Sequence, residues 1–128
     1  MPESYREAAL RHYDDAHRLA ESGHLDGAGY LVGYAVECAI KSAIEATRPA
    51  AEAPHLHLPH LLERAKKALQ GRRKHPLFTV IEKQGFMAGW AVEARYAANG
   101  ETDTDSYERW RTDATRTLGA ADLRRRPK

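Results

Sequence analysis

The sequence predicts an all-α fold, an up-and-down bundle of four to five helices. Several segments repeat apolar residues at the spacing of an amphipathic helix. One of them, residues 30–48, is apolar over most of its circumference, which is typical of the central helix of a small domain. The one strand-like stretch, residues 90–96, has no second strand to pair with. Helices that each carry an apolar stripe bury it against one another, as in a bundle.

The totals indicate one compact domain with a modest core. The chain has 128 residues, of which 42% are hydrophobic and 30% are charged, proportions typical of a single globular domain. Its formal net charge of +2 lacks the strong positive excess of a nucleic-acid coat protein. The last residues are nonetheless basic: Arg124, Arg125, Arg126 and Lys128. We therefore expect a bundle over residues 1–120 and a basic, flexible tail over residues 121–128.

The sequence favours a cytoplasmic protein. The single cysteine, Cys38, excludes a disulfide within the chain, and its apolar surroundings predict a buried, inert thiol. The first residues are acidic and amphipathic, unlike a signal peptide. Glu37 and Lys41 interrupt the longest apolar region, residues 30–44, so no membrane span is expected.

Local signals mark the ends of the first two helices. Ser4 with Glu7 three residues later is the pattern of a capping box, which predicts the start of the first helix. Gly23 suits the left-handed position that ends this helix. Asp26 is then expected to cap a second helix that runs to about Thr47.

Small residues occupy the first two turns of the second helix: Gly27, Ala28, Gly29 and Gly33. Each glycine costs about 1 kcal/mol of helical propensity relative to alanine. Such a cost indicates that another backbone approaches this helix closely, and the first helix is the simplest candidate. We therefore expect the first two helices to pack tightly against each other.

The middle of the chain predicts a loop followed by two helices. The stretch RPAAEAPHLHLP contains several prolines and no helical periodicity, so it is expected to be a loop. Pro59 fits the first turn of a third helix over residues 60–70. After a basic turn, a short helix is expected over residues 77–83, with a break around Gly85.

The last third predicts a connector and one more helix. Because residues 90–96 alternate like a strand but have no partner strand, we interpret them as a short helical or extended connector. Thr104 or Asp105 is expected to cap a last helix that extends to about Leu118. One face of this helix is apolar: Tyr107, Trp110, Ala114 and Leu118.

Three histidines lie close together in the stretch HLHLPH: His55, His57 and His60. Imidazoles bind transition metals, but the stretch lacks HxxxH spacing and an obvious fourth ligand, so no metal site is predicted. The plainer interpretation is a loop-to-helix junction, where His57 or His60 caps exposed amides or is half-buried. Because histidine titrates near neutrality, His60 is the candidate for acid–base chemistry if a cleft forms beside it.

A line of charged residues crosses the central apolar helix: Glu37, Lys41, Glu45 and Arg48. If Glu37 is buried, its carboxylate needs a partner. One alternative is an ordinary surface ion pair with Lys41, one helical turn away. The other is a bidentate pair with Arg95, from a segment that should pack on the bundle.

Three stretches, in this order, resemble HEPN-domain proteins: GAGYLVGYAVECAIKSAI (27–44), HLPHLLERAKKAL (57–69) and WAVEARY (90–96). The resemblance covers roughly residues 5–118 and implies a four- to five-helix bundle that commonly forms homodimers. It also implies a place in prokaryotic toxin–antitoxin, abortive-infection or other defence systems, often beside a nucleotidyltransferase-type partner. Many such proteins are metal-independent endoribonucleases, so no cofactor is implied.

Active members of this family carry an Arg-x4-6-His motif, and this chain departs from it. Arg95 is the counterpart of the arginine by position, but no histidine follows His75. Loose Arg-x5-His matches occur in the first helix and just after it: Arg6/His12, Arg11/His17 and Arg18/His24. Because the histidine is missing, we predict a protein that acts mainly by binding and dimerisation, with RNA, a nucleotide or a partner protein as its ligand.

Two alternative functions stay open. The first is a metal-independent endoribonuclease with a rearranged catalytic site of Arg95, Glu37 and His60. Arg95 would stabilise the charge of the phosphorane, and His57 or His60 would take the proton of the ribose 2′-OH. The second is a structural scaffold bundle whose polar line is solvated. The candidate binding residues are Lys41, His57 and Tyr96.

Overall fold

The computed structural model describes residues 4–47, 56–69, 75–93 and 100–123. These residues form helices and no strand, which confirms the all-α prediction. The helices, in chain order, are α1 (Tyr5–Glu21), α2 (Leu25–Thr47), α3 (His60–Ala68), α4 (Pro76–Ile81) and α5 (Thr104–Ala120).

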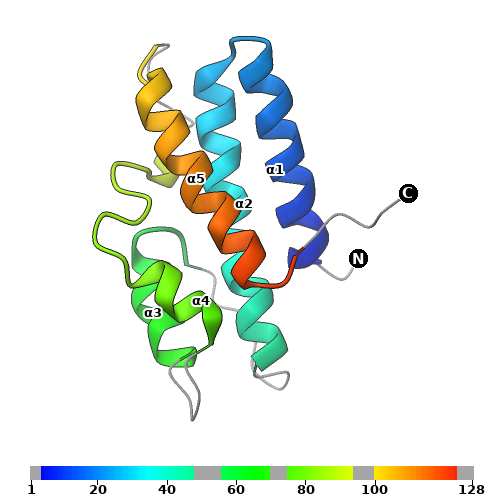
Figure 1. Cartoon of the computed structure of the whole chain (residues 1–128), viewed down its shortest axis with the longest axis vertical. Helices are drawn as coiled ribbons and strands as arrows, with labels where there is room; N and C mark the ends of the chain where they lie inside the picture. The colour runs from blue at the N-terminus through cyan, green and yellow to red at the C-terminus, as the bar shows by residue number, and fades with distance from the viewer. Residues whose placement is uncertain (1–3, 48–55, 70–74, 94–99, 124–128) are drawn as a thin grey trace.

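The helix α2 is the centre of the bundle. It packs against α1, α5 and α3, while α4 lies between α3 and α5. Figure 1 shows the three long helices α1, α2 and α5 side by side, with the short helices α3 and α4 together at one end of the molecule. The prediction that the most apolar helix is central is therefore confirmed.

The predicted ends of α1 are confirmed. The Ser4 hydroxyl accepts a hydrogen bond of 3.2 Å from the backbone N–H of Glu7, and Gly23 follows the helix with a φ of +81°. The predicted cap of α2 is wrong. The first bond of α2 runs from the backbone N–H of Ala28 to the carbonyl of His24, because the chain turns directly from Gly23 into the helix.

Asp26 lies in the first turn of α2 and holds a distant loop instead. Its carboxylate accepts hydrogen bonds from the backbone N–H groups of Gly100, at 2.7 Å, and Thr102, at 3.0 Å. These bonds favour the ionised form, and the bond from Gly100 contributes most to lowering the pKa of Asp26. Asp26 therefore attaches the segment before α5 to the start of α2.

The shorter elements differ from the prediction mainly at their ends. The helix α3 ends at Ala68, two residues before the expected end at residue 70. The helix α4 begins one residue before the expected start at residue 77 and ends two residues before the expected end at residue 83. The expectation that Thr104 or Asp105 caps α5 is wrong, because the cap is Asp103, whose carboxylate accepts from the backbone N–H of Ser106 at 2.7 Å. Of the predicted connector, residues 90–93 are described, and residues 92–93 form a 3₁₀ turn.

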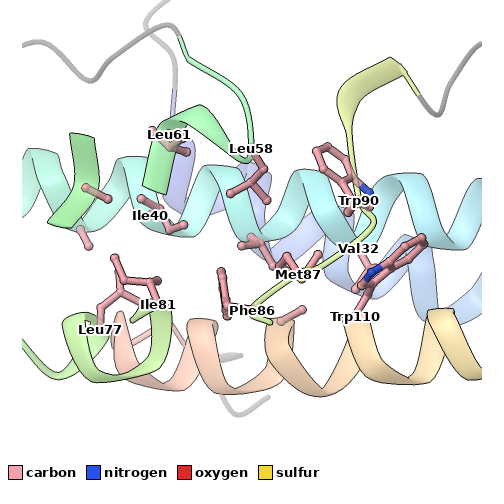
Figure 2. Packing of buried hydrophobic residues seen from close by; sticks show 14 of the residues in the cluster. Val32, Ile40, Leu58, Leu61, Leu77, Ile81, Phe86, Met87, Trp90 and Trp110 are labelled. Carbon is pink, nitrogen blue, oxygen red and sulfur yellow. The ribbon is translucent and has the colours of Figure 1, made fainter. Parts of the chain in front are cut away.

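The core lies between α2 and α5 and continues under α3 and α4. Figure 2 shows side chains of α2, α3, α4 and the segment after α4 meeting there, and the members with the largest buried side chains include Ile40, Leu61, Leu77 and Ile81. The predicted inner face of α5 is confirmed, since its four residues are all buried: Tyr107, Trp110, Ala114 and Leu118.

The folded unit extends past the boundary expected at residue 120. Leu123 is 4% exposed and packs in a small apolar cluster with Ala9 and Leu118. Its backbone N–H donates to the carbonyl of Leu118 at 2.8 Å. The bundle therefore includes Leu123, and residues 124–128 of the predicted basic tail lie outside the described part of the chain.

The small residues of α2 do bring neighbours close, but only one of these neighbours is α1. A Cβ at Gly27 would lie 3.3 Å from the side chain of Leu19 in α1. A Cβ at Gly29 would lie 3.0 Å from the side chains of Thr102 and Trp110, and one at Gly33 would overlap the indole of Trp90. The expectation that α1 explains all these glycines is therefore wrong. Within the described ranges, no helix is both long and apolar enough to cross a bilayer.

Candidate functional site

The carboxylate of Glu37 is buried at the middle of α2 and bound on both oxygens. The Glu37 side chain is 1% exposed. Its Oε1 accepts from Nδ1 of His57 at 2.9 Å, and its Oε2 accepts from the backbone N–H of Leu58 at 2.9 Å. A buried carboxylate is stable only with such partners, so Glu37 ties α2 to the residues that precede α3.

The predicted surface ion pair between Glu37 and Lys41 is wrong. Both residues are buried, and the described residues form no ion pair between them. The ammonium of Lys41 instead lies 5.5 Å from the ring centroid of Tyr5 in α1, within the range of a cation–π contact. The first two members of the charged line therefore face the protein, while Glu45 is exposed.

His57 is held by one ring nitrogen and exposed on the rest of its ring. Its side chain is 43% exposed. The Glu37 carboxylate is an acceptor, so the bond between them assigns a proton to Nδ1 of His57. In the neutral ring Nε2 then carries the lone pair, and no described group hydrogen-bonds to it. This is the arrangement in which a carboxylate orients an imidazole for binding or for proton transfer.

Aromatic rings surround this pair. The ring of Tyr34 lies 6.3 Å from that of His57 and 5.5 Å from that of His12 in α1. It also meets Tyr30 edge to face at 5.2 Å. Tyr30 in turn stacks on Trp90 at 6.2 Å with an interplanar angle of 18°. The rings therefore form a continuous series from α1 across α2 to the segments before α3 and after α4.

The aromatic half of this site was not predicted from the sequence. Tyr30, Tyr34, Glu37 and Lys41 follow one another at i, i+4, i+7 and i+11, a spacing that places them on one face of a helix. This spacing could have indicated that the two tyrosines share a helical face with the charged line. The contribution of His12 carries no such signal, because it depends on how α1 crosses α2.

The other predicted site residues are not joined to Glu37 in the described structure. His60 is exposed at the start of α3, and the Glu37 carboxylate binds His57 and Leu58 rather than His60. Arg95 and Tyr96 lie outside the described residues, as does His55. In the part of the chain that is described, no group of three acidic, histidine or cysteine side chains is arranged to hold a metal ion.

His12 is partly buried beside Tyr34. Burial is the main cause that lowers the pKa of His12 below its usual value, and the Arg11 cation lowers it further, while Asp15 opposes the shift. A lowered pKa keeps the ring neutral at neutral pH. The site therefore contains one imidazole bound to a carboxylate and a second one that stays uncharged.

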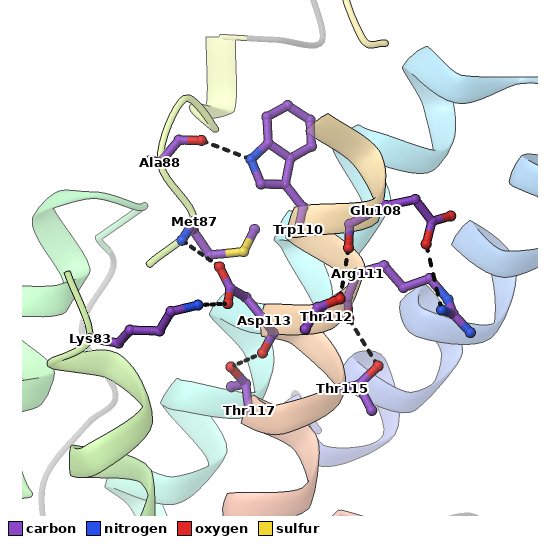
Figure 3. Close-up of polar contacts among 10 residues, drawn as sticks. All are labelled: Lys83, Met87, Ala88, Glu108, Trp110, Arg111, Thr112, Asp113, Thr115 and Thr117. Carbon is purple, nitrogen blue, oxygen red and sulfur yellow. Dashed lines mark hydrogen bonds and ion pairs between the residues drawn. The ribbon is translucent and has the colours of Figure 1, made fainter. Parts of the chain in front are cut away.

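A second buried carboxylate, Asp113 in α5, fixes the segment that follows α4. Asp113 accepts from the backbone N–H of Met87 at 2.9 Å and from the Lys83 ammonium at 3.3 Å, as Figure 3 shows. The indole N–H of Trp110 donates to the carbonyl of Ala88 at 2.9 Å on the same side of α5. Met87 has a φ of +52°, a conformation that its bond to Asp113 helps to hold.

A hollow of about 270 Å³ lies next to Asp113, and another of about 220 Å³ lies between α1 and α5. The first is lined by residues that include Lys83, Arg109 and Trp110. The second is mainly apolar, with Leu10 and Leu123 in its wall. Neither hollow includes a predicted site residue, so the Glu37–His57 pair remains the candidate site.

The chain matches the model of the HEPN domain family over residues 2–123. Comparisons with curated proteins and with solved structures found no match. HEPN domains are helical domains associated with nucleotides and RNA, and they often dimerise. The match covers nearly all of the chain, including the described helices α1 to α5 and the Glu37–His57 pair. The chain therefore belongs to the HEPN domain family.

Proposed function

We propose that this HEPN protein is a cytoplasmic, RNA- or nucleotide-binding component of a prokaryotic toxin–antitoxin or defence system and acts mainly by binding and dimerisation. The observation that carries the proposal is the Glu37–His57 pair. A buried carboxylate holds a partly exposed imidazole at a surface of aromatic rings. Such an imidazole binds a ribose hydroxyl through Nε2, or a phosphate when it is protonated.

Binding rather than catalysis is favoured by the missing histidine of the Arg-x4-6-His motif, since no histidine follows His75. A homodimer and a nucleotidyltransferase-type partner belong to the same proposal, because HEPN domains often dimerise. Light scattering at concentrations of tens of micromolar tests the dimer, and a strictly monomeric protein contradicts it. An adjacent gene that encodes a nucleotidyltransferase supports the partner.

Fluorescence polarisation with a labelled single-stranded RNA, in buffer with EDTA, tests the binding site. We expect His57→Ala to weaken binding, because it removes the imidazole that Glu37 orients. His60→Ala is the matched control, since His60 is an exposed histidine three residues away. Equal affinity of the His57→Ala and unmodified proteins contradicts the assignment of His57, and loss of binding in the control places the site at His60 instead.

A metal-independent endoribonuclease is the second candidate, and the Glu37–His57 hydrogen bond favours it. In this reaction Nε2 of His57 takes the proton of a ribose 2′-OH. The 2′-oxygen attacks the adjacent phosphorus, the bond to the 5′-oxygen breaks, and this oxygen leaves as a hydroxyl with a proton from water. The products are a 2′,3′-cyclic phosphate and a 5′-OH, and Arg95 is the proposed cation for the phosphorane.

Incubation of transfer RNA with the protein and EDTA tests this second candidate. A substrate with a 2′-deoxy sugar at the cleaved position should resist, because it lacks the attacking hydroxyl. Glu37→Gln, His57→Ala and Arg95→Ala should each slow cleavage, and His60→Ala decides whether His60 has any part in it. If the Arg95→Ala and His57→Ala proteins both cleave as fast as the unmodified protein, this site is excluded.

A further inference from the structure

Three partly exposed rings from different parts of the chain meet at Tyr34: His12 of α1, Tyr34 of α2 and His57 before α3. We call them the His12–Tyr34–His57 patch. Its three rings are each partly exposed, whereas Trp90 and Trp110 are buried in the core. A ligand that covers the exposed part of these rings gains free energy from the buried area.

The rings of the patch suit a flat, uncharged ligand group. Tyr34 offers a π-rich aromatic face, and burial, helped by the neighbouring Arg11, keeps the ring of His12 neutral at neutral pH. Nucleobases stack on such rings with little dependence on sequence, because every base has a π-face. The ring centroid of Tyr34 lies 5.5 Å from that of His12 and 6.3 Å from that of His57. These distances are typical of aromatic rings in contact.

The edges of the patch carry groups that suit a sugar and a phosphate. His57 is 43% exposed with Nδ1 bound to Glu37, so its other nitrogen faces no described partner. Arg11 is exposed and directly precedes His12 in α1. A guanidinium beside an aromatic surface is the combination by which proteins bind the backbone of a single strand while its bases stack.

We propose that the His12–Tyr34–His57 patch stacks against an unpaired nucleobase, with His57 at the sugar and Arg11 at the phosphate of the same nucleotide. The ligand is therefore a nucleotide with an accessible base, either free or within single-stranded RNA, and not a duplex. This inference rests on the proposed function, because it names the ligand class of the same site. It also gives His12, which lies on α1, a direct role in binding.

The first test uses the unmodified protein and two labelled oligomers of equal length and charge. One is a single-stranded RNA, and the other is its abasic counterpart, which keeps the ribose–phosphate backbone and lacks the bases. We expect the abasic oligomer to bind about tenfold to a hundredfold more weakly, because it cannot stack. Competition with adenosine monophosphate, with unlabelled single-stranded RNA and with an RNA duplex then separates a free nucleotide from a strand. Competition by the nucleotide or by the single strand supports the proposal, and stronger competition by the duplex overturns it.

Variants locate the stacking surface. Tyr34→Ala and His12→Ala should each reduce the preference for RNA over the abasic oligomer, whereas Tyr34→Phe keeps the ring and should keep the preference. His17→Ala is the matched control for His12→Ala, because His17 lies on α1, is 50% exposed and pairs with Glu21 instead. Arg11→Gln should weaken the binding of both oligomers to the same extent, because it removes a phosphate contact. Arg18→Gln is its control.

The outcomes separate this inference from the function on which it rests. If the RNA and the abasic oligomer bind equally well, stacking is excluded while RNA binding by the protein stands. If His17→Ala removes the preference as strongly as His12→Ala, the patch is the wrong surface. If neither RNA nor nucleotide binds at all, the proposed function and this inference both fail. Circular dichroism of each variant establishes that it is folded. The comparison of the RNA with the abasic oligomer uses the unmodified protein, so its result does not depend on the folding of any variant.

Discussion

The indole of Trp90 lies in the space that a side chain at position 33 would need. A Cβ added to Gly33 would overlap three atoms of the indole ring. Two contacts with α2 hold the indole there: its N–H donates to the carbonyl of Gly29 at 2.9 Å, and its ring stacks on Tyr30. The glycines of α2 thus let a side chain from after α4 lie directly on the backbone of the central helix.

Gly33→Ala should therefore lower the free energy of unfolding by about 3 kcal/mol, the upper range for overpacking a core. Urea denaturation measures this change. Gly119→Ala is the matched control, because it is also a helical glycine but a Cβ there meets no atom within 4 Å. We expect the control to be unchanged or stabilised by about 0.5 kcal/mol through its helical propensity. Equal stability of the two variants contradicts the close packing of Trp90 on Gly33.

Glu37→Ala tests how much the buried carboxylate of Glu37 contributes to stability. It leaves the buried N–H of Leu58 without an acceptor and creates a cavity, so we expect a loss of about 3 kcal/mol in the free energy of unfolding. Glu37→Gln fills the same volume and should lose about 1 kcal/mol. A loss below about 0.5 kcal/mol for Glu37→Ala, the size expected at ordinary surface sites, contradicts a structural role for this carboxylate.

Asp113 is buried and its ion-pair partner Lys83 is half-exposed. Removing Asp113 should therefore lower the stability more than removing Lys83. Asp113→Ala leaves the backbone N–H of Met87 without its acceptor and should cost about 2 kcal/mol of stability. Lys83→Ala removes a side chain that is 51% exposed, and screening by solvent limits its effect to less than about 1 kcal/mol. Denaturant midpoints of both variants measure the difference. If Lys83→Ala is the more damaging change, the ion pair rather than the bond to Met87 holds this segment.

His75 makes the stability of the protein sensitive to mild acid. Its Nδ1 accepts from the backbone N–H of Leu77 at 3.0 Å at the start of α4, and burial lowers the pKa of His75 from 6.5. The unfolded chain therefore binds more protons than the folded one as the pH falls below about 6.5, and stability falls with it. Above that pH the stabilising contribution is fully present.

Thermal unfolding between about pH 7 and pH 5 measures this effect. His75→Asn keeps an acceptor at the cap position and does not titrate there, so its stability should fall less steeply with acid than that of the unmodified protein. His12, whose pKa is also lowered, acts in the same direction in both proteins and cancels from the comparison. Parallel pH profiles for the two proteins contradict the role of His75.

The helices were predictable because their signals are local. Ser4 and Glu7 are three residues apart, and their hydrogen bond forms within one turn of α1. The inner face of α5 follows from a repeat within one helix. The cap of α2 was predicted wrongly for the opposite reason, since Asp26 is used by Gly100 and Thr102, more than seventy residues away.

The all-α class, the central position of α2 and the place of Glu37 in a line along that helix could be predicted from the sequence, because periodicity and capping act over one to three turns. Three contacts could not be predicted in this way: His57 with Glu37, His12 with Tyr34 and Trp90 with Gly33. Each of these contacts depends on the angle at which helices cross and on the path of a connecting segment. A side chain's spacing within its own helix carries no information about either.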